Sequence, residues 1–201
     1  MLIDLMRHGV PEGGRRYRGQ ADDPLSDAGW TQMWQAVGEY AEWQSIVTSP
    51  LVRCAAFADA LSEKRGIPVV RDDRLMECGF GEWEGKLPSE ICAQDANRLF
   101  RFKCDPVGNA PPGAEALSRF HARVGACWQD LLQHQKAGHV LVVTHAGVIR
   151  MMLSHALALD PRYAYRLAVS NAALTRIRVE CEDGVRLPTL LFHDGRLQEK
   201  S

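Results

Sequence analysis

The sequence has 201 residues, 46% of them hydrophobic and 24% charged, with a formal net charge of −1 at pH 7. These values are typical of a folded globular protein, and the near-zero charge argues against long-range attraction to nucleic acid or an anionic membrane. No apolar run reaches the roughly 18 residues that a membrane span requires. The amino terminus also lacks the basic and apolar regions of a secretory signal.

Six cysteines are scattered along the chain, without a C-x-x-C motif or another close pair. Such spacing favours free thiols in a reducing compartment, so we expect a cytoplasmic protein. The sequence does not indicate an oligomeric state, and a homodimer is left open.

Strand and helix patterns alternate through the first 70 residues. An apolar run at residues 2–6 predicts a buried strand that ends at Arg7 and His8, and a loop rich in glycine and arginine follows at residues 10–23. Ser26 is the expected N-cap of a helix. The apolar face of that helix holds Trp30, Met33, Trp34, Val37 and Ala41. The next predicted elements are a strand at 45–49, a helix at 51–64 closed by Gly66, and a short edge strand at 67–70 that contains Pro68.

The second half of the chain continues this alternation after a loop at residues 75–85. The predicted elements are a helix at 88–102, a flexible Pro/Gly-rich crossover at 105–113, a long helix from 114 to about 136, a strand at 140–144, a helix at 148–159, and strands at 173–181 and 187–192. Asp183-Gly184 is a hairpin-type turn between the last two strands.

This order of elements predicts an α/β fold: a three-layer sandwich with a mostly parallel central sheet, helices on both faces and an antiparallel ending. We expect a single domain over residues 1–201, with a small helical insertion near the active site at about 86–113.

A strand that runs into a histidine and then a glycine occurs twice. Residues 2–9 end in Arg7-His8-Gly9, and residues 140–147 end in His145-Ala146-Gly147. Open α/β sheets place their chemistry beyond the carboxyl ends of the strands, so we expect the two histidines to meet there. A neutral imidazole can attack phosphorus as a nucleophile. A structural histidine bonded to the backbone is the alternative interpretation of His8.

Two arginines occupy similar strand-end positions. Arg7 precedes His8, and Arg53 falls in the first turn of the predicted helix at 51–64, where its charge opposes the helix dipole. An anion docked on the helix-start amides would relieve that conflict, and guanidinium groups match phosphate oxygens. The alternative for Arg53 is a solvated surface side chain.

Glu77 lies in a loop, with Leu75 before it and Phe80 and Trp83 after it. A carboxyl group enclosed by apolar side chains can hold a proton near neutral pH and act as a general acid. The nearby Glu82 and Glu84 are expected to be solvated or ion-paired.

Two histidines, two arginines and one carboxyl group suit phosphoryl transfer, in which positioning and charge stabilisation dominate. Five motifs, in this order along the chain, resemble the histidine phosphatase (phosphoglycerate-mutase-like) superfamily. They are Leu5-Met6-Arg7-His8-Gly9, Gly19-x-x-Asp22-x-Pro24-Leu25-Ser26-x-x-Gly29, Ser49-Pro50-Leu51-x-Arg53, Leu75-x-Glu77-x-x-Phe80-Gly81-x-Trp83-Glu84-Gly85 and Thr144-His145-Ala146-Gly147.

The resemblance implies a catalytic role for each of five residues. His8 would be the nucleophile and become phosphohistidine, while Glu77 would protonate the leaving alcohol and then activate water. Arg7, Arg53 and His145 would hold the phosphoryl oxygens. No metal or other cofactor is implied.

The stretch after the nucleophile departs from the family pattern. Val10, Pro11 and Gly14 stand where many members have Glu or Gln, Thr or Ser, and Asn, so a side-chain phosphate contact is missing. The arginines that follow are the candidates to compensate, and Arg18 with Gly19 is the expected substrate-binding pair. The arginines in question are Arg15, Arg16 and Arg18.

Within the family, the short middle segment at residues 86–113 separates this sequence from typical phosphoglycerate mutases. The run from Phe80 to Gly85 and the Pro111-Pro112-Gly113-x-Glu115 motif look most like α-ribazole-phosphate phosphatases, which act in the assembly of the nucleotide loop of cobalamin. We therefore expect a phosphomonoesterase for a small phosphorylated metabolite, with α-ribazole 5′-phosphate as the best assignment. The alternatives are a broad-specificity phosphatase, a phosphoglycerate-mutase-type phosphotransferase and a silent binding module, against which the intact catalytic set argues.

Several other side chains are expected to be structural. The surface histidines would be His134 and His139, and the core tryptophans Trp30, Trp34 and Trp128. Trp83 is a candidate for the leaving-group pocket. Glu115 is expected to be a solvated cap of the long helix, with the pocket as the alternative.

Overall fold

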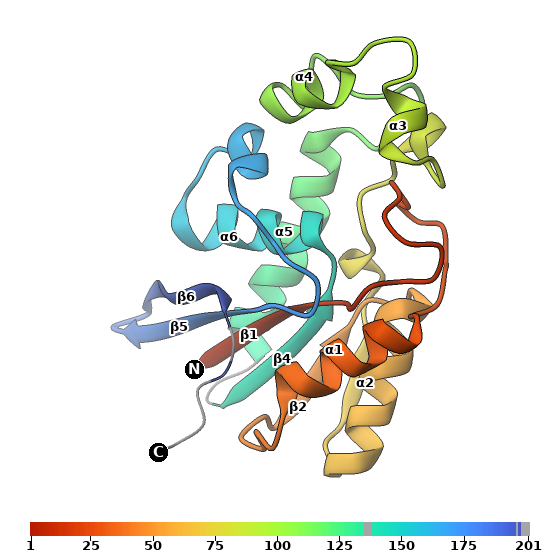
Figure 1. The fold of residues 1–201 in the computed structure, drawn as a ribbon. Helices are drawn as coiled ribbons and strands as arrows, with labels where there is room; N and C mark the ends of the chain where they lie inside the picture. Colours follow the sequence, from red (N-terminus) through yellow and green to blue (C-terminus); the bar gives the residue numbers. More distant parts are fainter. Residues whose placement is uncertain (135–137, 196, 198–201) are drawn as a thin grey trace.

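The computed structural model describes residues 1–134, 138–195 and 197 (Figure 1). Its strands form one mixed sheet in the order β3-β2-β4-β1-β5-β6. Their bounds are β1 Leu2–Arg7, β2 Ser45–Thr48, β3 Val69–Arg71, β4 His139–Thr144, β5 Leu174–Glu182 and β6 Val185–Gly195. The first four strands pair in parallel and the last two are antiparallel, which confirms the predicted sheet and the edge position of β3.

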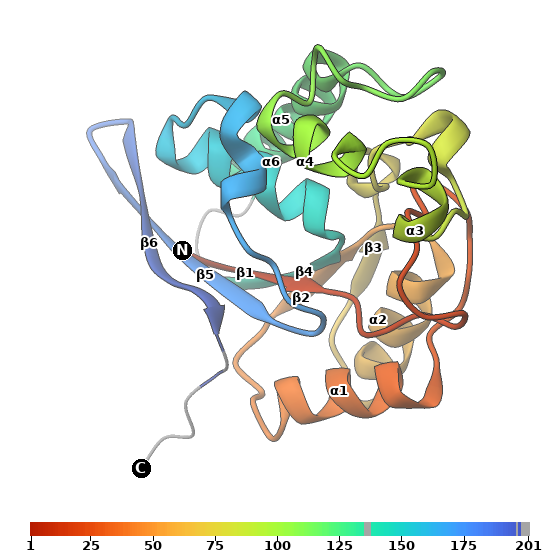
Figure 2. The ribbon, with the colours of Figure 1, turned by 45° about the horizontal axis from the view of Figure 1, so that its top comes forward.

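Helices cover both faces of this sheet, as the sequence predicts (Figure 2). Helices α1 (Asp27–Val37) and α2 (Val52–Arg65) lie on one face, and α5 (Leu117–His134) and α6 (Ala146–Leu157) lie on the other. Neighbouring side chains of a strand point to opposite faces. In β1, Leu5 therefore packs in the core beside α5 and α6, while Met6 packs in the core beside α1 and α2.

The ends of the first two helices follow from local chemistry. The Ser26 hydroxyl accepts a hydrogen bond from the Gly29 N–H at 3.1 Å, which confirms the predicted N-cap of α1. Gly66 adopts a left-handed conformation, with φ 68°, and ends α2. Helix α1 stops at Val37, so Ala41 lies beyond it.

The insertion between residues 86 and 113 differs from the single helix predicted at 88–102. Two short helices stand there instead, α3 (Pro88–Ile91) and α4 (Arg98–Cys104), at the top of Figure 1. Asp95 interrupts the helix because its carboxylate accepts from the Asn97 N–H and pairs with Arg101, competing with the helical backbone. The segment predicted as a flexible crossover is tied to α4 by Arg98, whose Nη1 donates to the Asn109 carbonyl at 2.9 Å.

Some element boundaries also differ from the prediction. Helix α5 begins at Leu117 and not at residue 114; its predicted end near residue 136 lies outside the described residues. Helix α6 begins at Ala146, directly after His145. Three 3₁₀ helices were not predicted: η1 Asp73–Leu75, η2 Gly81–Trp83 and η3 Pro161–Arg166. Strand β6 includes Pro188, which an edge strand tolerates.

The side chains predicted to be structural fall into two groups. Trp128 is buried in the core beside α5 and α6, and Trp30 and Trp34 pack partly buried against the core on the opposite face of the sheet. All six cysteines are free thiols, as expected. The prediction for His139 is wrong: it is buried, because Nε2 lies 2.9 Å from Asp4 Oδ2 and Nδ1 lies 3.1 Å from the Tyr40 hydroxyl. The side chain of His134 lies outside the description.

No helix within residues 1–134 and 138–195 is both long and apolar enough to cross a lipid bilayer.

Candidate active site

His8 stands directly after β1, which lies between β4 and β5 in the sheet. Its backbone N–H donates to the Thr144 carbonyl at 3.0 Å, and its ring Nδ1 lies 2.7 Å from the Gly9 carbonyl oxygen. A carbonyl oxygen can only accept, so Nδ1 carries the proton and the lone pair resides on Nε2. His8 therefore presents the tautomer that a nucleophilic Nε2 requires.

The environment of His8 keeps its imidazole neutral. Burial lowers the pKa of His8 well below its usual value, and the positive charges of Arg7 and Arg53 lower it further, against a smaller opposing effect of the Gly9 hydrogen bond. A neutral ring retains the nucleophilic lone pair.

His145 stands directly after β4 and meets His8, as the strand-end pattern predicts. The two ring centroids lie 5.2 Å apart in an edge-to-face arrangement. His145 is fully buried, its Nε2 lies 2.8 Å from the Ser49 hydroxyl, and burial lowers its pKa well below the usual value. His145 lies behind His8 and is not part of the cavity wall, so direct contact between His145 and a phosphoryl group stays a prediction.

Arg7 and Arg53 both line the cavity in front of His8. Arg7 Nη1 donates to the Val169 carbonyl at 2.7 Å. Burial lowers the pKa of Arg7 to about 10, and the charges of Arg150 and Arg53 contribute in the same direction, whereas Glu77 opposes the shift. Among the described residues, neither Nε–H has a hydrogen-bond partner. These two guanidinium groups repel each other and retain unused donors, which is the electrostatic setting of an anion site.

Arg53 stands in the first turn of α2, as predicted, but it is almost fully buried rather than solvated. Its Nη1 donates to the Ala21 carbonyl at 2.6 Å and its Nη2 to the Gly19 carbonyl at 2.8 Å. The loop after β1 therefore holds the guanidinium group in place. Gly19, predicted as a substrate-binding residue, lines the cavity and also supports Arg53.

Glu77 reaches the same cavity from the loop after η1. Its Oε1 accepts from the Cys78 N–H at 2.9 Å, and its Oε2 accepts from the Gly147 N–H at 3.1 Å. The expected apolar enclosure is thus only part of its surroundings, because two backbone amides fix the carboxyl group. The Gly147 amide holds it at the N-terminal end of helix α6, two residues after His145.

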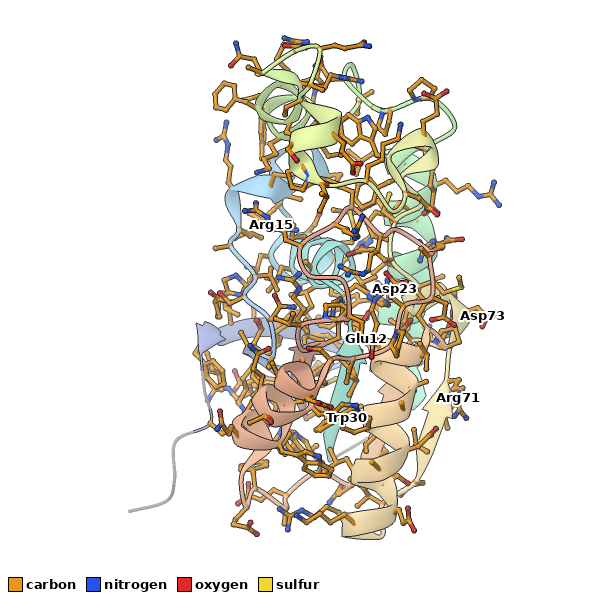
Figure 3. The ribbon with its side chains drawn as sticks, turned by 45° about the vertical axis from the view of Figure 1, so that its right-hand side comes forward. Glu12, Arg15, Asp23, Trp30, Arg71 and Asp73 are labelled. Carbon is orange, nitrogen blue, oxygen red and sulfur yellow. The ribbon has the colours of Figure 1, made fainter. Side chains whose placement is uncertain are left out.

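The three loop arginines have different surroundings. Figure 3 shows their loop, with Glu12, Arg15 and Asp23 labelled, above α1 and α2. Arg18 is buried. It forms an ion pair with Asp23 at 2.7 Å and donates a hydrogen bond to the Glu12 carbonyl. Arg16 donates to the Gly85 carbonyl at 2.8 Å. Arg15 is exposed and, within the described residues, has no ion-pair partner. All three line the cavity. Among the described residues, neither Arg15 nor Arg16 forms an ion pair, but Arg16 also donates to two backbone carbonyls.

The cavity has a volume of about 440 Å³, within the range of small-molecule sites. Val10, Pro11 and Gly14 form part of its wall and bring no polar side chain, as their sequence positions indicate.

Further residues of the wall were not predicted. These are Tyr17, Lys103, Arg150, Tyr165 and Asn171, whereas Phe80, Ala146 and Gly147, which also line the wall, belong to the sequence motifs that carry Glu77 and His145. Asn171 Nδ2 donates to the His8 carbonyl at 3.1 Å, and the guanidinium group of Arg150 lies 5.1 Å from the Tyr165 ring centroid. The position of Arg150, one helical turn beyond Ala146, could have identified it. Lys103 comes from the insertion, where no sequence motif marked it. Trp83, expected at the pocket, packs instead against Phe102.

Comparison with known proteins identifies the family to which the chain belongs. The sequence model of the histidine phosphatase superfamily, branch 1, matches residues 3–188. A Mycobacterium tuberculosis protein described as bifunctional is 33% identical over 176 residues, which make up 85% of this chain and 48% of that protein. The chain thus spans about half the length of that relative. A Klebsiella pneumoniae protein named "Probable phosphoglycerate mutase GpmB" is 32% identical over 186 residues, or 88% of this chain and 84% of that protein.

Solved structures share the whole fold. A mycobacterial glucosyl-3-phosphoglycerate phosphatase superposes with a TM-score of 0.87 at 26% identity, over 96% of this chain and 99% of that one. The α-ribazole phosphatase of Shigella flexneri gives a TM-score of 0.78 at 22% identity over 100% of both chains, a likeness that shows the fold alone. The family match covers the motifs around His8, Arg53, Glu77 and His145. This chain belongs to the histidine phosphatase superfamily.

Proposed function

We propose that this protein is a metal-independent phosphomonoesterase that hydrolyses a small phosphorylated metabolite through a phosphohistidine at His8. The observation that carries the proposal is the hydrogen bond from His8 Nδ1 to the Gly9 carbonyl, which leaves the lone pair on Nε2. Arg7 and Arg53 flank this ring on the cavity wall, and Glu77 stands on the same wall.

In the first step, Arg7 and Arg53 bind the oxygens of the dianionic phosphoryl group. His8 Nε2 forms a bond to phosphorus while the bond from phosphorus to the ester oxygen breaks. Glu77 donates its proton to the departing oxygen, so the product leaves as a neutral alcohol. His145, packed against His8, would contact the phosphoryl group once its ring turns from Ser49 toward the cavity.

In the second step, water attacks the phosphohistidine. Glu77, now a carboxylate, takes a proton from that water as the N–P bond breaks. Inorganic phosphate leaves, and His8 returns to the neutral tautomer that the Gly9 carbonyl stabilises. Both steps rest on positioning and charge stabilisation by residues of this chain.

For the substrate, we propose α-ribazole 5′-phosphate. Its aromatic base suits a wall that contains Tyr17, Phe80 and Tyr165, and the motifs around Phe80 and Glu115 support the same choice. The free thiols support a reducing, cytoplasmic setting. The name of the Klebsiella relative supports a phosphoglycerate mutase as the second candidate.

The test is phosphate release from a panel of phosphomonoesters that contains α-ribazole 5′-phosphate, phosphoserine and 3-phosphoglycerate, without a bisphosphate cofactor. We expect release by the wild type, an acid-labile phosphoenzyme in rapid-quench samples, and loss of both in His8→Ala. Isomerisation of 3-phosphoglycerate that requires a bisphosphate would favour the mutase. Turnover that survives in His8→Ala would exclude the phosphohistidine route.

A further inference from the structure

Arg123, in the middle of α5, binds the backbone of the segment that carries Glu77. Its Nη1 donates to the carbonyls of Arg74 and Met76 at 2.8 and 2.7 Å, and its Nη2 donates to the carbonyl of Glu77 itself at 3.0 Å. One side chain therefore fixes three carbonyl groups within four consecutive residues. Among the described residues, Arg123 forms no hydrogen bond with another group of the proposed mechanism, although its charge contributes to the lowered pKa of His145.

Glu115 holds Arg123 in this position. Its two carboxylate oxygens accept from Arg123 Nε at 2.7 Å and from Nη2 at 2.8 Å, and only 12% of the Glu115 side chain is exposed. The Glu115 N–H also donates to the Gly79 carbonyl at 2.9 Å. Glu115 is thus not the solvated cap that the sequence suggests, and it lines a small adjoining cavity and not the one in front of His8. It joins the residues on either side of Glu77 to the start of α5.

The guanidinium group suits this position for a geometric reason. Arginine offers five N–H donors in a rigid plane, and here the plane also lies over the Phe120 ring, 4.6 Å from its centroid. Residues 74–77 run from a 3₁₀ turn into a loop, so their carbonyl groups depend on side-chain donors. A lysine ammonium group at position 123 could not serve three carbonyls and a carboxylate in this arrangement.

We propose that Arg123, oriented by Glu115, is the positioning residue for the general acid Glu77. The proposal rests on the proposed function, because it assigns Arg123 to the proton transfer. Two elements converge on Glu77: α6 binds its carboxyl group through the Gly147 N–H, and α5 binds its backbone through Arg123. Loss of the contact between Arg123 and the Glu77 backbone would displace the Glu77 carboxyl group from the departing oxygen. His8, Arg7 and Arg53 would stay in place.

A purely structural role for Arg123 predicts something different. A destabilised fold lowers the active fraction and reduces turnover of all substrates equally. A displaced general acid affects only esters whose leaving group needs a proton, and general acid–base catalysis contributes about 10²–10⁴-fold to such reactions. The dependence on leaving group therefore separates positioning from support of the fold.

The experiment compares kcat/KM for two substrates. The phenolate of p-nitrophenyl phosphate leaves without being protonated, whereas the alkoxide of glycerol phosphate must be protonated as it leaves. This parameter covers the steps up to phosphorylation of His8 and excludes the later hydrolysis of phosphohistidine. The variants are Arg123→Met, Arg123→Lys and Glu115→Gln, with Glu77→Gln as the reference for a lost acid. The matched control is Arg74→Met, because the Arg74–Asp130 ion pair at 2.7 Å also joins η1 to α5 without contacting Glu77.

We expect Arg123→Met to lower kcat/KM for glycerol phosphate at least about tenfold more than for p-nitrophenyl phosphate, in the direction of Glu77→Gln. Arg123→Lys and Glu115→Gln should show the same bias to a smaller extent, and Arg74→Met should show none. An unchanged ratio in the folded Arg123 and Glu115 variants, beside a changed ratio in Glu77→Gln, would overturn the positioning role and leave the proposed function intact. No bias in Glu77→Gln, or no phosphate release by the wild type, would instead overturn the proposed function.

Discussion

The backbone N–H of Gly147 donates to Glu77 Oε2 at 3.1 Å, and only glycine leaves room for this contact. A Cβ atom at position 147 would overlap Glu77 Oε1 and press on the Phe120 ring. The glycine of the His145-Ala146-Gly147 motif therefore serves the carboxyl group of a loop that lies 70 residues away in sequence.

We predict that Gly147→Ala displaces Glu77 and lowers kcat/KM for alkyl phosphates by about 10²-fold, the lower range of general acid–base catalysis. Steady-state phosphate release measures this, and thermal unfolding verifies the fold. In a Glu77→Ala background the overlap with Oε1 disappears and only the close contact with the Phe120 ring remains, so the added Gly147→Ala change should cost much less. Equal losses from Gly147→Ala in both backgrounds would show that the clash lies elsewhere.

We predict that Arg53→Met weakens phosphate binding and lowers kcat/KM by about 10²–10³-fold, as loss of one preorganised donor does at other charged transition states. Inorganic phosphate that binds the folded protein should raise the melting temperature of the wild type. A ligand at a hundredfold excess over its Kd stabilises the folded state by about 2.7 kcal/mol. That shift should shrink in Arg53→Met.

The control for this variant is Arg71→Met. Arg71 pairs with Asp59 on the exposed surface of β3 and does not line the cavity. Its variant should keep the phosphate-induced shift. A full shift in Arg53→Met would remove Arg53 from the anion site.

The stability of the protein should depend on pH through His145. Burial holds the pKa of His145 well below 6.5, so at mildly acidic pH the unfolded chain binds a proton that the folded chain does not. The neutral, buried His145 therefore costs no stability above pH 6.5, and the free energy of unfolding decreases as the pH falls below this value. The slope is at most about 1.4 kcal/mol per pH unit for one group. Urea unfolding between pH 7.5 and 5.5 should show a smaller loss in His145→Gln than in the wild type; parallel curves would contradict the buried neutral state.

The sequence predicts that His8 and His145 meet because both stand at the ends of strands. The position of a strand end follows from an apolar run, so the meeting of His8 and His145 could be inferred before the structure. Arg53 was placed by the same logic at a helix start. The supporting residues Arg123 and Asn171 carry no such signal, because they bind backbone carbonyls of distant segments.

Two features could not be predicted from the sequence: the break between α3 and α4 and the burial of His139. Asp95 lies in the break between α3 and α4, where the sequence predicts one continuous helix, and its side-chain hydrogen bond to the Asn97 N–H competes with the helical backbone. His139 looked like a surface residue because its partners, Asp4 and Tyr40, are 135 and 99 residues away in sequence. Contacts of this range follow from the three-dimensional packing alone.

These partners lead to a last prediction, about stability. Asp4 is fully buried in β1, and its carboxylate accepts from Arg176 Nε at 2.8 Å and from Trp43 Nε1 at 2.8 Å, with His139 at 2.9 Å. Burial alone would raise the pKa of Asp4, but the hydrogen bonds from Arg176 and His139 outweigh it and lower the pKa. Asp4 therefore stays charged inside the protein because its partners compensate for lost hydration.

We predict that Arg176→Met lowers the free energy of unfolding by about 3–5 kcal/mol, because it leaves a buried carboxylate without its strongest partner. Urea unfolding at pH 7 measures the change. The matched control is again Arg71→Met, which breaks an exposed pair with Asp59 and should cost less than about 1 kcal/mol. Similar losses in the two variants would mean that Asp4 is stabilised by Trp43 and His139 alone. Restoration of stability in the double variant Asp4→Leu/Arg176→Met would identify the unpaired charge, and not the lost packing of Arg176 on Tyr40, as the cause.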